Sequence, residues 1–291
     1  FYKPMNDWAD FRVLHLQGLK RLAITYDAGK KMWSMKVVES NVSATSKAPH
    51  ASFTLGKHNW TITGDDGCDR GKTYETVLKM SGCQDGEFTC NDGQCVSMDE
   101  RCNQLPKCRD ESDERGCKLI ILKDGFNKNI PPIGRNKDRR ASSRAIAANV
   151  SISIILIKVV EIEETDHSIH LQFQISLSWK ENRVTYQNLK KETPLNALTE
   201  EDVETIWLPL IVYDNTDQKD STRLGVAWEW STLVSVVREG NFIRSGIDVV
   251  DEAEIFEGSE NTLWMTQTYT KEFQCNYQLQ KYPFDTQVNE T

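Results

Sequence analysis

The residues in this 291-residue sequence that stand out chemically are its cysteines. Six of the eight lie between Cys83 and Cys117, in a stretch too short to bury a hydrophobic core of its own. Such density predicts either disulfide bonds or a zinc site. The spacing lacks the paired CxxC or HxxxH units of a zinc site, so disulfides are favoured, and six cysteines leave fifteen ways of pairing. Disulfides place the protein in an oxidising compartment.

The sequence also carries four N-x-S/T sequons, at Asn41, Asn59, Asn149 and Asn289. They agree with an extracellular protein that bears N-linked glycans. The sequence opens abruptly at Phe1 without a signal peptide, and no run of about 18 apolar residues follows. The most apolar stretch, residues 150–162, is interrupted by Lys158 and Glu161, which favours a strand over a membrane helix. We therefore expect an ectodomain fragment or a secreted protein.

Charge and motif content exclude several classes of function. The net charge of −8 argues against nucleic acid or an anionic membrane surface as the partner. The basic run Arg135–Arg140 has no interleaved aromatic residues for base stacking, so it is interpreted as a solvated linker. The five histidines are scattered, and no HExxH, GxSxG or P-loop motif is present. We expect a binding protein and not an enzyme.

The segments that must position these residues predict a mainly β, multi-domain chain. Residues 1–82 contain short aromatic and β-branched runs separated by turns, which predict a partial β-sandwich of the lectin-like kind. Residues 83–117 form the cysteine module, and 118–146, with Pro131-Pro132, form a linker. From 147 to 291 the pattern predicts a larger, partial β-sandwich.

Two elements of the last domain are specified in detail. From Ile169 to Trp179 every odd position is apolar and every even one polar, which predicts a strand with one buried face. Thr199 is followed three residues later by Asp202, so a short helix is expected there, with Thr199 as its N-cap.

The cysteine spacing carries a first resemblance. Cys83-x6-Cys90-x4-Cys95-x6-Cys102-x5-Cys108-x8-Cys117, with Phe88, Gly93-Gln-Cys95 and the acidic end Asp110-Glu-Ser-Asp-Glu114, closely resembles the low-density-lipoprotein-receptor class A module. The resemblance implies the disulfides Cys83–Cys95, Cys90–Cys108 and Cys102–Cys117.

The same resemblance implies one calcium ion held by oxygen ligands. By position, Asp113 and Glu114 would bind through carboxylates, and Glu100 and Leu105 through backbone carbonyls. Asn103 and Lys107 stand where the family usually has aspartates; asparagine still offers an oxygen, whereas the lysine ammonium opposes a cation. The alternative to a weak calcium site is a disulfide-held module with no calcium.

A second resemblance covers the last domain. Trp179-Lys-Glu-Asn-Arg183, Ile206-Trp-Leu-Pro209 and Cys275-x6-Tyr-Pro-Phe-Asp285 occur in the order and spacing of the Cys-loop ligand-gated ion channel extracellular domain. Pro131-Pro132 followed by long strands resembles the start of that domain. We interpret Trp179, Arg183 and Trp207 as core and inter-strand anchors, not as ligand contacts.

In that family, aromatic rings line an agonist site between neighbouring subunits of a pentamer, and their faces attract cationic amines. By position, Tyr186, seven residues after Trp179, and Tyr213 would contact the ligand; for both, ordinary strand packing is the alternative. Leu210 and Asp214 depart from the family's usual aspartate and aromatic residues. The cysteine that should pair with Cys275 belongs at residue 289, where this chain has asparagine.

The resemblances together imply the extracellular region of a neurotransmitter-gated, pentameric ion channel subunit on the outer side of the plasma membrane. A small-molecule agonist bound at the interfaces of a homo- or hetero-pentamer would gate ion transport. The alternative is a secreted or endocytic adhesion protein whose class A module and lectin-like domain bind a protein or glycan partner.

Overall fold

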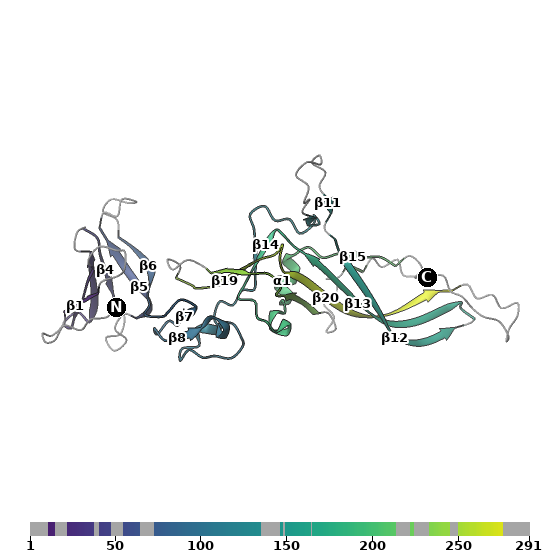
Figure 1. Cartoon of the computed structure of the whole chain (residues 1–291), viewed down its shortest axis with the longest axis horizontal. Coiled ribbons are helices and arrows are strands. Elements are labelled where there is room, and N and C mark those ends of the chain that lie inside the picture. Colours follow the sequence, from purple (N-terminus) through teal and green to yellow (C-terminus); the bar gives the residue numbers. More distant parts are fainter. Residues whose placement is uncertain are drawn as a thin grey trace. The chain divides into compact units, whose positions relative to one another are not determined.

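The computed structural model describes residues 11–14, 22–37, 41–47, 55–64, 73–134, 146–147, 149–163, 165–213, 222–223, 233–244 and 250–275. Two compact units are present, and strands dominate both (Figure 1). Unit 1 comprises Phe1–Cys117 with Arg244–Ala253, and unit 2 comprises Lys118–Ile243 with Glu254–Thr291. The expected mainly β, multi-domain fold is confirmed.

An antiparallel sheet of six strands, ordered as in the sequence, forms the first part of unit 1. The strands are β1 (Phe11–Leu14), β2 (Leu22–Asp27), β3 (Met32–Val37), β4 (Ser43–Ser46), β5 (Gly56–Thr63) and β6 (Thr73–Met80). Its buried core consists of Ile24, Trp33, Ala44 and Trp60. The described strands form one sheet, so a second layer of the expected lectin-like sandwich is not seen among them.

The cysteine module follows the sheet within unit 1. It contains β7 (Glu87–Thr89) paired with β8 (Cys95–Ser97), and the short 3-10 turns η2 (Met98–Glu100) and η3 (Ser112–Glu114). Three disulfides close it: Cys83–Cys95, Cys90–Cys108 and Cys102–Cys117. This is the pairing that the class A resemblance implied, so that prediction is confirmed. Phe88, Val96 and Met98 pack with Cys90 and Cys108 in a small core.

Two four-stranded sheets build unit 2, ordered β12-β13-β20-β17 and β18-β19-β14-β9. The first contains β12 (Ser151–Glu163), β13 (Ser168–Lys180), β20 (Thr262–Gln274) and β17 (Leu233–Val237). The second contains β18 (Phe242–Arg244), β19 (Glu254–Glu257), β14 (Val184–Gln187) and β9 (Ile120–Leu122). Both sheets contribute to one hydrophobic core.

Smaller elements complete unit 2. They are the strand pairs β10 (Ile133–Gly134) with β11 (Ile146–Ala147) and β15 (Leu210–Ile211) with β16 (Thr222–Arg223), the 3-10 turn η4 (Thr193–Asn196) and the helix α1 (Glu200–Thr205). Thr199 caps α1: its Oγ1 accepts a hydrogen bond from the Asp202 backbone N–H at 3.2 Å and donates to the Asp202 carboxylate at 2.9 Å. The predicted cap is confirmed.

The strand predicted from alternation is also confirmed, whereas the predicted linker needs correction. Phe173, Ile175, Leu177 and Trp179 on β13 are all buried, as the period of two requires. The linker expected at 118–146 contains β9, which pairs with β14 and buries Ile120 in the core of unit 2. Its three residues are too few for a periodic pattern, and only the pairing with β14 reveals the strand.

Among the residues that the structure describes, no helix is long and apolar enough to cross a membrane.

Candidate functional site

A pair of tryptophans anchors the core of unit 2. Trp179 at the end of β13 is buried, and its ring meets that of Trp207 edge to face, with centroids 6.0 Å apart. Edge-to-face packing places the positive rim of one ring against the negative face of the other. The two tryptophans therefore hold β13 to the segment after α1, in agreement with their interpretation as core anchors.

A buried ion pair adjoins them. Arg183 donates from Nε to Glu181 Oε1 at 2.8 Å and from Nη2 to Glu181 Oε2 at 2.6 Å, and Glu181 is fully buried. The second terminal nitrogen of Arg183 donates to the carbonyls of Asn127 and Ile130. Two parallel hydrogen bonds of this kind fix the orientation of the guanidinium group and also balance the charge of the carboxylate. The interpretation of Arg183 as an inter-strand anchor is confirmed, and it fastens residues 127–130 to the turn before β14.

Tyr186 lies inside the core and not on a surface. It is fully buried on β14, where its register partners are Phe256 on β19 and Ile120 on β9. Burial raises the pKa of its phenol well above the usual range, and the nearby Glu181 carboxylate adds to this. The resemblance implied a ring facing a subunit interface, but the middle strand of the sheet turns this ring inward. In the described conformation Tyr186 has no surface with which to contact a ligand.

Tyr213 lies in a different setting, a cluster of aromatic rings at the other sheet. Its ring meets Phe173, Tyr269 and Phe273 edge to face, with centroids about 6 Å apart. The side chain is half-buried, and burial raises the pKa of Tyr213 to about 12. Its hydroxyl has no hydrogen-bond partner among the described residues. Of the two tyrosines expected to contact a ligand, Tyr213 alone keeps part of its ring exposed.

The acidic end of the cysteine module is ordered by backbone hydrogen bonds. The buried carboxylate of Asp113 accepts from the N–H groups of Lys107 at 2.6 Å and Cys108 at 3.2 Å. That of Glu114 accepts from Asn103 at 2.9 Å and Gln104 at 3.0 Å. The two carboxylates thus shape the loop between Cys102 and Cys108 by accepting hydrogen bonds from its backbone N–H groups.

The oxygen atoms of the expected ligand residues suit a hard cation, but the positive charge of Lys107 opposes one. Asn103 Oδ1 already accepts from the Leu105 N–H at 2.9 Å. Carboxylate, amide and carbonyl oxygens are what calcium requires. Lys107 Nζ, however, lies 3.7 Å from Glu100 Oε1, which keeps a positive charge beside an expected ligand residue.

Two other groupings of potential metal-binding side chains contain sulfur: Cys83, Glu87 and Cys95, and Cys90, Cys108 and Asp110. In both, the cysteines are joined to each other in disulfides, so they have no thiolate to offer a metal.

Comparison with known proteins agrees with this geometry. The sequence profile of the neurotransmitter-gated ion-channel ligand binding domain matches residues 119–289. The chain belongs to this family. The match begins at residue 119, which places β9 inside the ligand-binding domain, in agreement with its position in the core of unit 2.

The profile of the low-density lipoprotein receptor domain class A matches residues 81–117. Among curated proteins, the vitellogenin receptor of Solenopsis invicta is 30% identical over 63 residues, which is 21% of this chain and 4% of that protein. The chain therefore spans a small fraction of the length of this relative, and the likeness is one of a module.

Within the ligand-binding domain, the family's namesake disulfide is represented by Cys275 alone. Its sulfur is buried and forms no disulfide with any described residue, and its backbone N–H donates to His167 O at 2.6 Å. The Tyr282-Pro-Phe-Asp285 motif and Asn289 lie outside the described residues, as does Asp214.

Proposed function

We propose that this chain is the extracellular region of a pentameric neurotransmitter-gated channel subunit that binds a small molecule between subunits. The observation that carries the proposal is the family match over residues 119–289, supported by the tryptophan pair and the Glu181–Arg183 fork of the domain. Binding would take place on the outer side of the plasma membrane and would gate ion flow in the assembled protein.

Tyr213 is the aromatic residue that we assign to the ligand. The partly exposed Tyr213 packs against three aromatic rings, and the faces of such rings attract cationic amines and stack on neutral ligands. Tyr186, fully buried on the other sheet, does not touch the ligand.

Current recordings from cells that express the channel subunit test the proposal, with a panel of small transmitter molecules applied outside. We expect one class of molecule to open the channel, and Tyr213→Ala to weaken its apparent affinity at least tenfold. Trp264→Ala is the matched control, because this exposed ring on β20 lies outside the cluster. Equal responses of the Tyr213 and Trp264 variants would remove Tyr213 from the site, and absence of any ligand-gated current would remove the channel function.

The class A module supplies a second, weaker site in this proposal. Asp113, Glu114 and Asn103 would hold one calcium ion with side-chain oxygens, and Glu100 and Leu105 with carbonyls. The positive charge of Lys107, 3.7 Å from Glu100, would weaken this site.

The similarity to the vitellogenin receptor favours a second candidate function, in which the class A module binds a protein or glycan partner in a secreted or endocytic adhesion protein. Either function is extracellular, and we propose glycans at Asn41, Asn59 and Asn149, which are all exposed; Asn289 lies outside the described residues. Loss of mass on enzymatic deglycosylation of the secreted chain checks these sites.

A further inference from the structure

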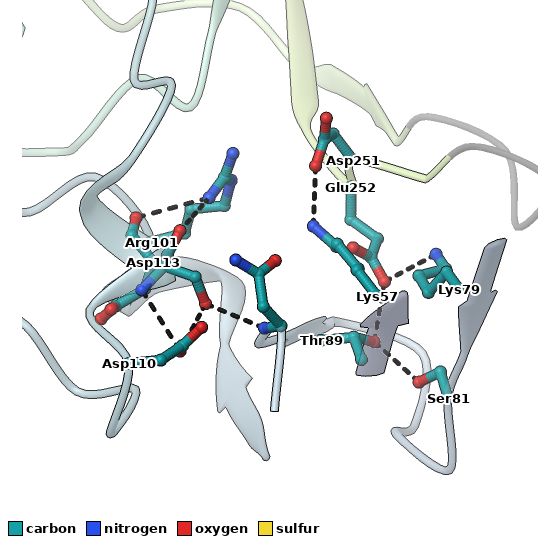
Figure 2. Close-up of polar contacts among 11 residues, drawn as sticks. Lys57, Lys79, Ser81, Thr89, Arg101, Asp110, Asp113, Asp251 and Glu252 are labelled. Atoms are coloured by element: carbon teal, nitrogen blue, oxygen red, sulfur yellow. Dashed lines mark hydrogen bonds and ion pairs between the residues drawn. The ribbon is translucent and has the colours of Figure 1, made fainter. Parts of the chain in front are cut away.

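Three cationic side chains that are largely shielded from solvent lie together in unit 1. Lys57 comes from β5, Lys79 from β6, and Arg101 from the residue after η2 in the class A module (Figure 2). The side chains of Lys57 and Lys79 are 8% and 11% exposed, and Arg101 is 5% exposed as a whole residue. Lysine and arginine are almost never this buried unless their charge is balanced.

Close backbone contact between the sheet and the module places these cations. The Lys57 N–H donates to Asn91 O at 3.0 Å, and Gly56 before it has a φ of 96°. A side chain at residue 56 would overlap the Asn91 carbonyl, so only glycine allows the two backbones to approach this far. The start of β5 therefore lies against the class A module, and the Lys57 side chain reaches Phe88 in the small core of that module.

Phe88 is the point where two of the cations meet. Lys57 Nζ lies 4.5 Å, and the guanidinium carbon of Arg101 4.1 Å, from the centroid of this buried ring. The face of the Phe88 ring attracts each cation. The two positive charges, however, repel each other because both lie close to the same ring. Arg101 also donates to the carbonyls of Ser112 and Asp113. Neither contact supplies a negative charge.

The negative charge comes from Asp251 and Glu252, in the segment Arg244–Ala253. Lys57 Nζ donates to Asp251 Oδ1 and Lys79 Nζ to Glu252 Oε1, each at 2.7 Å (Figure 2). Thr89 Oγ1 donates to the same Glu252 oxygen at 2.8 Å. Desolvation lowers the pKa of Arg101, and Asp251 and Glu252 are the first carboxylates that oppose this shift. Asp251 and Glu252 thus pair with the two lysines and, together with Glu114 and Asp113, oppose the desolvation of Arg101 through their charge.

The degree of burial separates the Lys79–Glu252 pair from ordinary surface ion pairs. The partners Lys79 and Glu252 are 11% and 17% exposed, whereas Lys180 and Glu239, 3.0 Å apart in unit 2, are 47% and 46% exposed. An exposed pair contributes little, because water screens it. Removing one partner of a buried pair leaves the other charge desolvated and unbalanced, which is strongly destabilising.

We propose that Asp251 and Glu252 form an acidic strap, an intramolecular ligand for the cation cluster of Lys57, Lys79 and Arg101. Thr89, which bonds to Ser81 at 2.7 Å, orients the Glu252 carboxylate between the sheet and the module. The strap lies between β18 and β19 in the sequence, and it belongs to unit 1 with the class A module and the N-terminal sheet.

The strap continues directly into an anchored strand. The residue after Ala253, Glu254, exchanges two hydrogen bonds with Asn188: its N–H donates to Asn188 Oδ1 at 3.0 Å, and its carbonyl accepts from the Asn188 N–H at 2.8 Å. If the strap is released, we expect residues 250–253 to become more mobile, whereas Glu254 at the start of β19 stays held by Asn188. The strap is independent of which ligand the ligand-binding domain binds.

A double-mutant cycle on the whole secreted chain tests the strap, with Lys79→Gln, Glu252→Gln and the double variant followed by denaturant unfolding. We expect a coupling of at least tenfold in the unfolding equilibrium constant of unit 1, which corresponds to about 1.4 kcal/mol. The matched cycle of Lys180→Gln and Glu239→Gln should give less than threefold. A Lys79–Glu252 coupling no larger than this control overturns the proposal.

Hydrogen exchange on the same variants supplies a second readout. Glu252→Gln should speed exchange of the amides at residues 250–253 at least tenfold and leave β20 amides unchanged; the swap of Lys79→Glu with Glu252→Lys should restore most of the protection. Should the Glu252 variants not fold, Lys57→Gln and Asp251→Asn replace them, because the Asp251 side chain is 74% exposed and this pair is therefore less buried than Lys79–Glu252. Unchanged exchange at 250–253 in the folded variants refutes the strap.

Discussion

Tyr186 offers the sharpest test of the core of the ligand-binding domain, because two substitutions at this position should act in opposite ways. Tyr186→Ala removes a fully buried ring from between β9 and β19. A tyrosine buries roughly 150–250 Å², which at about 25 cal/mol per Å² amounts to ~4–6 kcal/mol. The alanine keeps part of this, so we expect a loss of about 3–5 kcal/mol. Domain stabilities are about 5–15 kcal/mol, so this variant will be marginal.

Tyr186→Phe removes only the hydroxyl. Among the described residues that hydroxyl has no hydrogen-bond partner, and an unpaired buried polar group carries a desolvation penalty of about 1–3 kcal/mol. Phenylalanine keeps the ring and removes the penalty, so the variant should be as stable as the parent or more stable by about 1 kcal/mol.

Tyr269→Phe is the matched control, because the same atom is removed from a hydroxyl that does have a partner. Tyr269 Oη donates to Gln267 Oε1 at 2.8 Å in a buried position. Loss of that bond should cost about 0.5–1.5 kcal/mol. The measurement is denaturant unfolding of each variant, with hydrogen exchange of β14 and β20 peptides to assign the transition to unit 2, since the two units need not unfold together.

Two results would refute this reasoning. A loss above about 1.5 kcal/mol in Tyr186→Phe would mean that the hydroxyl has a partner. A loss below about 1 kcal/mol in Tyr186→Ala, together with weaker ligand binding, would return Tyr186 to the ligand-facing surface that the family resemblance implied.

Lys107→Asp should tighten calcium binding at least tenfold by adding a carboxylate and removing the opposing ammonium; calorimetry that shows unchanged affinity would contradict this. Arg183→Met should cost about 3–5 kcal/mol in thermal or denaturant unfolding by leaving Glu181 charged and buried, and adding Glu181→Leu should recover much of it; equal losses would show no coupling. The hydrogen bond from Lys57 lowers the pKa of Asp251 in the folded state. The stabilisation by this carboxylate is therefore complete above its unfolded pKa of about 4 and is lost as the pH falls through the lower folded pKa. Asp251→Asn should make the free energy of unfolding of unit 1 less dependent on pH in this acid range, and an unchanged dependence would contradict this. Ile155→Lys on β12 should reduce self-association in sedimentation velocity, and a parent chain that stays monomeric at high concentration would show that this surface is inert.

Local chemistry made part of this structure predictable from the sequence. The Thr199 cap depends on atoms three residues apart, and the buried face of β13 on a strict period of two. The disulfide pairing was available only through the class A resemblance, since six cysteines alone leave fifteen connectivities. In each case the information lies within a short stretch of chain.

The features that escaped prediction depend on contacts between distant residues. The inward direction of Tyr186 requires β9 on one side and β19 on the other, and β9 lies in a segment that reads as a linker. The Lys57–Asp251 pair joins residues 194 positions apart. The sequence around Lys57 does not indicate that its partner is Asp251, and the sequence around Asp251 does not indicate Lys57. A cluster of cations becomes visible as a site only when its burial is known.

The strand β12 shows a different relation between sequence and structure. Its run Ser151–Glu163 has apolar residues on both faces, a pattern typical of strands covered on both sides, yet nearly all of it is exposed in the described chain. On one edge it pairs with β13, and among the described strands none pairs with its other edge. Long, apolar, exposed edges are avoided in monomers because they recruit other chains, and this one carries only three charges, at Lys158, Glu161 and the terminal Glu163. The contacts of the described chain do not account for this apolar pattern, and we expect association of copies through β12 to cover it, as the proposed pentamer would require.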